Sequence, residues 1–253
     1  MSQLLHASAF TRTLPATRFK AKNMDRKRKI ILFSGVAAIL ILGLITVVSI
    51  VIPLMHAPGV KTPELDASNA KPATTEVDGD WQVVYGQSPN ISSVGFTFDE
   101  LLPAKEQVTS GSTRAVSGDV SIQNKTLTSA HVEVDMSAVA TDQEKRDINV
   151  RNKIFETNKY PSAYFDLDGN VDVSSLGDNA EVSEITAPGK LTIHGQTNQV
   201  DPTFKAVRSG DQIILSTSIH INRNDYGVES PEFVAAKIND EGDINILLTL
   251  EKK

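Results

Sequence analysis

The stretch GKLTIHGQTNQVD, residues 189–201, alternates apolar and polar side chains and then places His194 beside Gly195. Successive side chains of a β-strand point to opposite faces, so Leu191 and Ile193 are predicted to face the core and His194 to face away from it. This phase favours a half-buried strand, and it gives His194 a structural role before a chemical one.

The same period of two recurs along the C-terminal part of the chain. Its inward positions are apolar: Val94, Phe96 and Phe98, then Val132, Val134 and Met136, then Ile213, Leu215, Ile219 and Ile221, then Ile244, Ile246, Leu248 and Leu250. Alternation over so many runs is typical of strands with one buried face. Segments with glycine and aspartate predict turns between them: SGD at 117–119, LGDN at 176–179, SGDQ at 209–212 and NDEGD at 239–243.

This spacing predicts a mainly antiparallel β fold of about eight to ten strands, arranged as a barrel or a sandwich. One segment has a helical pattern instead. TDQEKRDINV, residues 141–150, begins with Thr141 and has Glu144 three residues later, which is the spacing of a capping box. Pro161 stops any helix by Tyr160, so one or two short helices are expected here.

An uncharged apolar run of 25 residues covers 30–54. As a helix it would extend roughly 37 Å, more than the ~30 Å hydrocarbon core of a bilayer, and it is longer than the ~7–15 apolar residues of a cleaved signal peptide. Residues 30–55 are therefore predicted to be an uncleaved transmembrane anchor. The basic RKRK at 26–29 precedes the run, which predicts a cytoplasmic N-terminus and an extracytoplasmic C-terminal domain at the cell membrane.

Four regions follow from these patterns. Residues 1–29 are expected to be a disordered basic tail, and residues 30–55 the anchor. Residues 56–78 contain three prolines and no apolar period, which predicts a linker that lets the domain float away from the bilayer. Residues 79–253 are expected to form the β domain.

Composition excludes several classes of function. The chain has no cysteine, which excludes disulfides, thiolate metal sites and a cysteine nucleophile. Residues 76–253 hold 15 basic and 28 acidic side chains, a formal charge of −13. Nucleic-acid binding depends on lysine and arginine, so no nucleic-acid partner is expected.

The sequence has no nucleophile elbow, phosphate-binding loop, dinucleotide fingerprint or zinc-protease motif. His131, His194 and His220 are predicted to point outward, and they could hold a metal only if their strands were adjacent. The pattern favours ordinary strand histidines, and neither a metal, a cofactor nor a catalytic residue is predicted.

Several motifs occur in a familiar order after Trp81: VGFTF (94–98), SGDVSI (117–122), RDINVRNKIFETNKYPSAYFDL (146–167), GKLTIHGQT (189–197) and INRNDYGV (221–228). Together they resemble the YceI-like family of polyisoprenoid-binding proteins, over roughly residues 80–251. The resemblance implies an extended, lipocalin-like antiparallel β-barrel of about eight strands around an apolar tunnel. It also implies a bound isoprenoid lipid, no catalysis and a possible homodimer.

Alternation and the resemblance together give the expected wall of that tunnel, whose members share an apolar or aromatic side chain: Phe96, Phe98, Val120, Ile122, Val134, Met136, Phe155, Tyr160, Phe165, Leu191, Ile193, Ile219, Ile221 and Tyr226. Arg146, Asp147 and Arg223 are the expected polar end, where a head group would lie.

Two other functions remain open at this point. In the first, the barrel has a solid core and acts as an interaction or adhesion module. In the second, it is an enzyme that acts on a lipid or quinone and uses His194 or a carboxylate. An isoprenoid-binding protein such as a polyprenyl or quinone carrier is the favoured function, because apolar tunnels with few polar groups suit such ligands.

Overall fold

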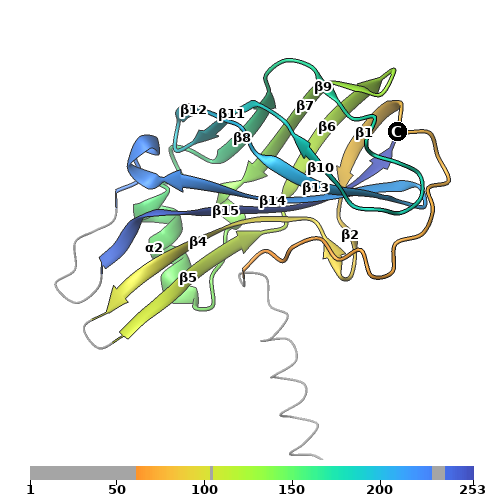
Figure 1. Ribbon diagram of the computed structural model, residues 1–253. Coiled ribbons are helices and arrows are strands. Elements are labelled where there is room, and N and C mark those ends of the chain that lie inside the picture. Colours follow the sequence, from red (N-terminus) through yellow and green to blue (C-terminus); the bar gives the residue numbers. More distant parts are fainter. Residues whose placement is uncertain (1–60, 103–104, 230–236) are drawn as a thin grey trace, which may run out of the picture. The chain divides into compact units, whose positions relative to one another are not determined.

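A computed structural model of the chain describes residues 61–102, 105–229 and 237–253 (Figure 1). The predicted tail, the predicted anchor and the first five residues of the predicted linker lie outside these ranges, as do residues 103–104 and 230–236. Within them, no helix is both long and apolar enough to cross a bilayer.

Thirteen strands of the described residues form one sheet. Its main path runs through ten of them in this order: β10 (Ser183–Thr186), β13 (Thr203–Ser209), β14 (Gln212–Asn222), β15 (Lys237–Lys252), β1 (Gly79–Val84), β6 (Val116–Gln123), β7 (Thr126–Asp135), β8 (Ser162–Leu167), β11 (Gly189–Ile193) and β12 (Gln196–Val200). Off this path, β4 (Ser93–Leu102) pairs with β15 and β5 (Lys105–Thr113), and β9 (Val171–Asp172) pairs with β7. A separate pair joins β2 (Gly86–Gln87) to β3 (Asn90–Ile91).

In the described residues the helical elements are few and short. They are η1 (Met136–Ala138), α2 (Glu144–Asn149), the π-helical turn η2 (Val150–Ile154) and η3 (Arg223–Tyr226). The expectation of short helices after residue 141 is confirmed.

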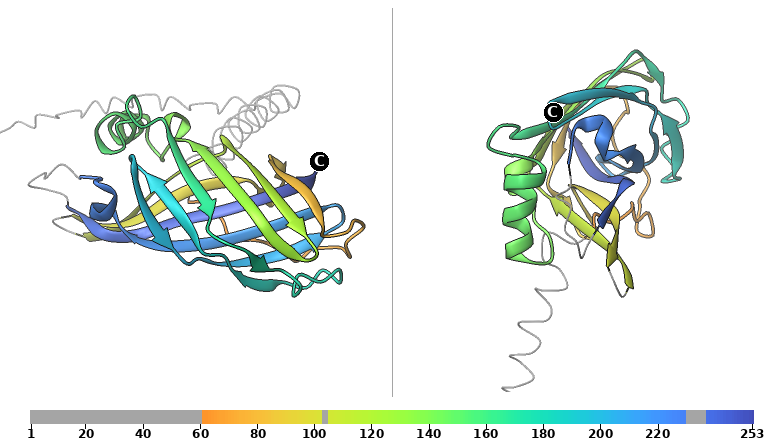
Figure 2. Two further views of the ribbon diagram at one scale, coloured as in Figure 1. Left: turned by 90° about the horizontal axis from the view of Figure 1, so that it is seen from above. Right: turned by 90° about the vertical axis from the view of Figure 1, so that its left-hand side faces the viewer.

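Strand β15 organises the sheet because three strands pair with it. β14 follows one edge, while β4 and then β1 follow the other. All these pairs are antiparallel, and among the described strands the order ends at β10 and β12. The right-hand view of Figure 2 shows the result, a strongly curled sheet that forms a half-barrel. The predicted mainly antiparallel β fold is confirmed, whereas a single curled sheet takes the place of a barrel of about eight strands.

The inner face of the curl holds the core. Most of the positions predicted to face inward are buried there, including Phe96, Phe98, Val134, Met136, Leu191, Ile193, Ile219, Ile221, Ile244, Ile246 and Leu248. Trp81 is fully buried in a second cluster with Ile122, Ile213 and Leu250, and its indole Nε1 donates to the Val77 carbonyl at 2.9 Å. A hydrogen-bonded indole satisfies its polar group, so the ring contributes apolar area to the core at no polar cost.

The described part of the predicted linker packs on the outer face of the sheet. We call residues 61–77, orange in Figure 1, the strap. Leu65 donates its amide to Ser216 Oγ at 3.1 Å, and Thr74 donates to the Gly210 carbonyl at 2.7 Å. The expectation of a freely extended linker is wrong for this segment, because its backbone groups find partners on β14 and on the β13–β14 turn.

The strap also covers apolar side chains. Val207, Ile214 and Leu247 form a buried cluster on the outer face, and strap residues pack against it: Leu65, Ala67 and Ala70. At this cluster, strands β13, β14 and β15 are therefore buried on both faces. Alternation alone did not predict this second buried face.

Two of the predicted turns lie inside strands. SGD at 117–119 belongs to β6, and NDEGD at 239–243 belongs to β15. In β15 the register against β4 shifts between Ile238 and Gly242, so the glycine marks an irregularity of the strand and not its end. The turns predicted at 176–179 and 209–212 are outside regular strands at their centres.

The predicted capping box is replaced by a different contact. Helix α2 begins at Glu144, and its N-cap Gln143 makes no side-chain cap. Instead, Asp147 Oδ1 accepts from the amide of Thr141 at 2.6 Å and from its hydroxyl at 2.7 Å. A carboxylate of the helix does bond to Thr141, but it is that of Asp147 and not that of Glu144.

Candidate functional site

The inner face of the curled sheet has three apolar, partly open cavities lined by described residues. The large cavity has a volume of about 110 Å³. The other two measure about 60 Å³ each. We call the first the large cavity. Of the other two, the Arg223 cavity is the one that Arg223 lines, and the middle cavity is the one that Val134, Met136 and Ala163 line. Since protein cores normally leave few voids larger than a water molecule, such a series is a departure from solid packing.

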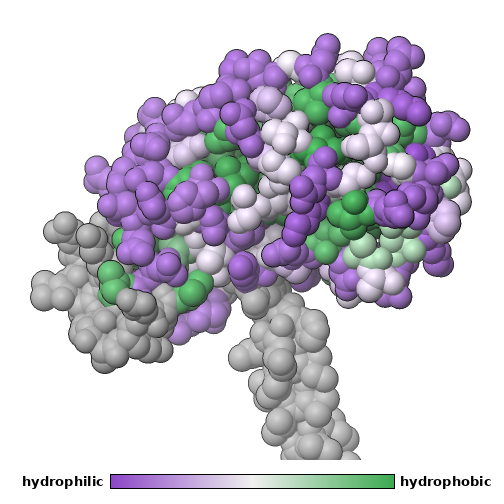
Figure 3. Space-filling view, viewed as in Figure 1, coloured by the Kyte–Doolittle hydropathy of each residue, from purple (hydrophilic) through white to green (hydrophobic). Residues whose placement is uncertain are grey.

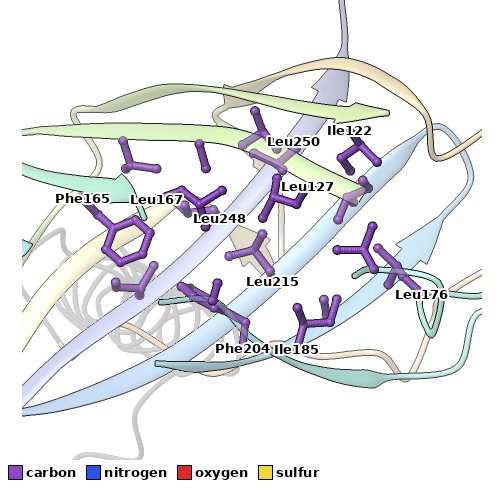
Figure 4. Close-up of a pocket in the computed structure, with 18 residues that line it drawn as sticks. Ile122, Leu127, Phe165, Leu167, Leu176, Ile185, Phe204, Leu215, Leu248 and Leu250 are labelled. Atoms are coloured by element: carbon purple, nitrogen blue, oxygen red, sulfur yellow. The ribbon is translucent and has the colours of Figure 1, made fainter. Parts of the chain in front are cut away.

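The large cavity is lined only by apolar side chains, and Figure 4 shows them converging on it from several strands. They are Val120, Ile122, Leu127, Ala130, Val132, Phe165, Leu167, Val173, Leu176, Ile185, Ala187, Phe204, Ala206, Ile213, Leu215, Ile246, Leu248 and Leu250. Without a polar group to hold water, a cavity of this kind suits an apolar ligand.

The three cavities share walls and therefore follow one another. The middle cavity shares Val132, Phe165 and Ile246 with the large cavity. On its other side it shares four residues with the Arg223 cavity: Phe96, Phe155, Ile193 and Ile244. They amount to one elongated apolar space along the inside of the sheet, divided by side chains.

Polar side chains lie at one end of this space. Arg223 and Thr109 line the Arg223 cavity. The Arg223 guanidinium donates through Nη1 to the Val228 carbonyl at 2.7 Å and through Nη2 to Asp240 Oδ1 at 2.5 Å. Its charge is thus balanced by a carboxylate that is itself half exposed.

Two further hydroxyls belong to the same end. The Thr109 hydroxyl donates to Glu100 Oε2 at 2.6 Å. Tyr226 also lines the cavity, and burial raises the pKa of its hydroxyl above the ordinary value. The surface of the cavity itself is apolar, so these three polar side chains mark one end of the space without presenting a polar group inside it.

Twelve of the fourteen predicted wall residues line a cavity: Phe96, Phe98, Val120, Ile122, Val134, Met136, Phe155, Phe165, Leu191, Ile193, Ile221 and Tyr226. Ile219 is buried in the core cluster but lines none of the three. Tyr160 lies elsewhere, with its ring 4.3 Å from the imidazole of His194. These are statements of position, and contact with a ligand remains a prediction for every residue.

Of the predicted polar end, only Arg223 lies at a cavity. Arg146 on α2 forms an ion pair with Asp142, which lies four residues earlier and before the helix begins. Asp147 accepts the two hydrogen bonds from Thr141 described above. Both side chains hold the start of the helix, and neither is brought to the cavities.

Several lining residues were not among the predicted wall residues, although strand phase would have identified some of them. Val132, Ile213, Leu215, Ile246, Leu248 and Leu250 all have the inward phase that the sequence shows. Val173 and Leu176 lie in a segment without a strand period, and no local pattern identifies them. Phe204 and Ala206 alternate with Lys205 on β13, a run too short to be decisive by itself.

The histidines do not gather. His131 Nδ1 lies 2.6 Å from Asp166 Oδ1, and His220 Nδ1 lies 3.1 Å from Asp243 Oδ1. The described residues contain no group of three or more histidine, aspartate or glutamate side chains placed to hold a metal. The neighbouring Asp243 carboxylate raises the pKa of His220 by accepting a hydrogen bond from it.

His194 is in the β11–β12 turn and not in the strand. It has φ of 52° and Gly195 has φ of 74°, the left-handed values of a two-residue hairpin turn. The imidazole packs against Tyr160, and its Nε2 lies 3.1 Å from Glu156 Oε2. It faces away from the cavities, as its phase predicted, although the strand ends before it.

The surface of the domain differs from its interior. The face shown in Figure 3 is mostly hydrophilic, with apolar residues in separate small patches. On this face, therefore, apolar side chains do not form one continuous surface.

A family model described as the YceI-like domain matches residues 85–250. Among solved structures, BcnA of Burkholderia cenocepacia is similar with a TM-score of 0.52 and 20% identity, over 62% of this chain and 95% of that one. A polyisoprenoid-binding domain from Saccharophagus degradans, implicated in plant cell wall breakdown, has a TM-score of 0.50 and 19% identity, over 64% of this chain and 98% of that one. At these identities the structures establish a shared fold. No curated protein sequence matches.

Proposed function

The chain belongs to the YceI-like domain family, and on that basis we propose that its curled sheet binds the apolar chain of an isoprenoid lipid without catalysing a reaction. The ligand would be a polyprenyl or quinone-like amphiphile. The observation that carries the proposal is the series of three apolar cavities that share walls along the inside of the sheet, with a charged side chain, Arg223, lining the last of them.

The physical basis is burial of hydrocarbon. Each CH₂ group removed from water contributes about 0.8 kcal/mol, so a long chain binds tightly without any specific polar contact. Polar groups are needed only where the head group emerges, and we place that point near Arg223, the charged residue among those that line the cavities. The polyisoprenoid-binding domain that shares the fold supports this ligand class.

The cellular setting is part of the proposal. The uncharged run at 30–54 and the basic residues before it support a domain tethered to the cell membrane, with its C-terminal part extracytoplasmic. A lipid carrier at a membrane surface has its ligand in reach. The homodimer implied by the family resemblance stays a prediction.

The test uses the full chain purified in a mild detergent, followed by solvent extraction and mass spectrometry of the extract. The matched control is Ile193→Arg, which places a charge in the wall shared by the middle and Arg223 cavities. Lipids carried along by the detergent will appear in both samples. An isoprenoid present with the wild type and absent with the variant is the expected result.

Equal extracts from two folded proteins would contradict the proposal and favour the interaction module. If Ile193→Arg does not fold, Ala163→Leu narrows the middle cavity with an uncharged side chain and gives the same comparison.

A further inference from the structure

Aromatic rings lie in both of the walls that neighbouring cavities share, and each is part of a pair of rings in contact. Phe165 lines both the large and the middle cavity, and its ring centroid lies 6.2 Å from that of Phe204 in an edge contact. Phe165 is on β8 and Phe204 is on β13, far apart in the strand order, so the contact joins two distant parts of the curled sheet. Figure 4 shows both rings at the same end of the large cavity.

The second pair is Phe96 on β4 and Phe155, which follows the π-helical turn η2. Their ring centroids are 5.6 Å apart, and both residues line the middle cavity and the Arg223 cavity. The Phe96–Phe155 contact thus lies on the boundary between two cavities. In the other pair, Phe165 is on the boundary and Phe204 packs against it from the large cavity.

One ring of each pair lies against a glycine. Gly111 is directly opposite Phe96 on β5, and a Cβ atom there would be 2.8 Å from two carbons of the Phe96 ring. At Gly189 a Cβ atom would be 2.4 Å from the Phe165 ring. Neither glycine has the positive φ that would require it for the backbone. Each glycine therefore leaves the space in which the neighbouring phenylalanine ring lies against the sheet. A larger residue at either position would displace that ring.

We propose that these two aromatic pairs are the stops that determine how long an apolar chain the space accepts. This inference rests on the proposed function. A chain whose head group stays near Arg223 reaches the middle cavity only by passing Phe96 and Phe155. It reaches the large cavity only by passing Phe165 and Phe204, so each pair displaced adds one compartment to the bound length.

The test measures affinity of the full chain in detergent for farnesol, geranylgeraniol and solanesol, three isoprenoid alcohols of increasing length. Gly111→Ala moves the Phe96 ring into the passage, because the new methyl group also lies 3.2 Å from the Ala140 carbonyl and cannot move away from the ring. The ratio of solanesol affinity to farnesol affinity is expected to fall by about fourfold for each methylene excluded.

Two companion variants separate a stop from general damage. Gly111→Ala combined with Phe96→Leu removes the displaced ring and restores the ratio. Gly177→Ala, at a loop glycine without a positive φ, leaves the ratio at the wild-type value. An unchanged ratio in folded Gly111→Ala, or no rescue by Phe96→Leu, overturns the inference.

If Gly111→Ala does not fold, Phe204→Leu tests the same idea in the opposite direction. It weakens the contact before the large cavity, and the solanesol-to-farnesol ratio is expected to rise. A ratio that stays the same overturns the inference. Failure of the wild type to bind any of the three alcohols would instead contradict the proposed function.

Discussion

Asn90 holds Asp66 at two points. The Asp66 amide donates to Asn90 Oδ1 at 2.9 Å, and Asn90 Nδ2 donates to the Asp66 carbonyl at 2.8 Å. The Asn90 side chain thus satisfies both backbone groups of Asp66, as a neighbouring strand would. Asn90 is buried, so water does not substitute easily for either bond.

Asn90→Ala is expected to lower the free energy of unfolding by about 1–3 kcal/mol, because two backbone groups of the strap lose their partner. Chemical denaturation measures the loss, and hydrogen exchange should show faster exchange at the Asp66 amide. Asn69→Ala removes an exposed strap asparagine and is the control, with an expected change within about 0.5 kcal/mol. Equal stability of the two variants would mean that the two Asn90–Asp66 hydrogen bonds do not stabilise the fold.

Leu247 tests the apolar cluster beneath the strap. It has no exposed surface, and Leu247→Ala is expected to cost about 2–5 kcal/mol through lost burial and a new cavity. Leu101→Ala removes the same atoms from a side chain that is 44% exposed and should change stability little. Thermal unfolding of the three proteins compares them, and a small effect at Leu247 would show that the strap does not seal this face.

His220 is expected to titrate above the ordinary pKa of histidine, because Asp243 accepts a hydrogen bond from its imidazole. A histidine whose pKa is raised in the folded state contributes stability below the unfolded pKa. That stability is lost as the pH rises through the folded pKa. Asp243→Asn should lower the pKa of His220 in an NMR titration. The same pKa in both proteins would remove Asp243 as the cause.

The sequence predicted the inner face of the sheet well, because strand phase is a local signal. Phe96 and Phe98, like Ile219 and Ile221, are two residues apart and share a buried face in the structure. The wall of the cavities follows from the same period. The division into three compartments does not, since it depends on contacts such as Phe165 with Phe204 across distant strands.

The strap was missed because its apolar residues have no period and its partners lie on the face assumed to meet solvent. The sequences of β14 and β15 nevertheless contain a sign that their outer faces are covered. Ile213 with Ile214, and Leu247 with Leu248, are adjacent apolar pairs that interrupt the alternation. Such pairs are expected where both faces of a strand are buried, and here they are.

His194 provides the last prediction, because it decides between a structural and a chemical role. Its φ of 52° suits asparagine or glycine better than alanine. His194→Ala keeps a Cβ atom at the same φ, so its expected cost of about 1 kcal/mol comes from the lost contact with Tyr160. His194→Asn tolerates the turn and should cost less, and both variants should bind isoprenoid alcohols as the wild type does. Loss of binding in a folded His194→Asn would give the imidazole a part in the function, since the turn and the cavities would be intact in that protein.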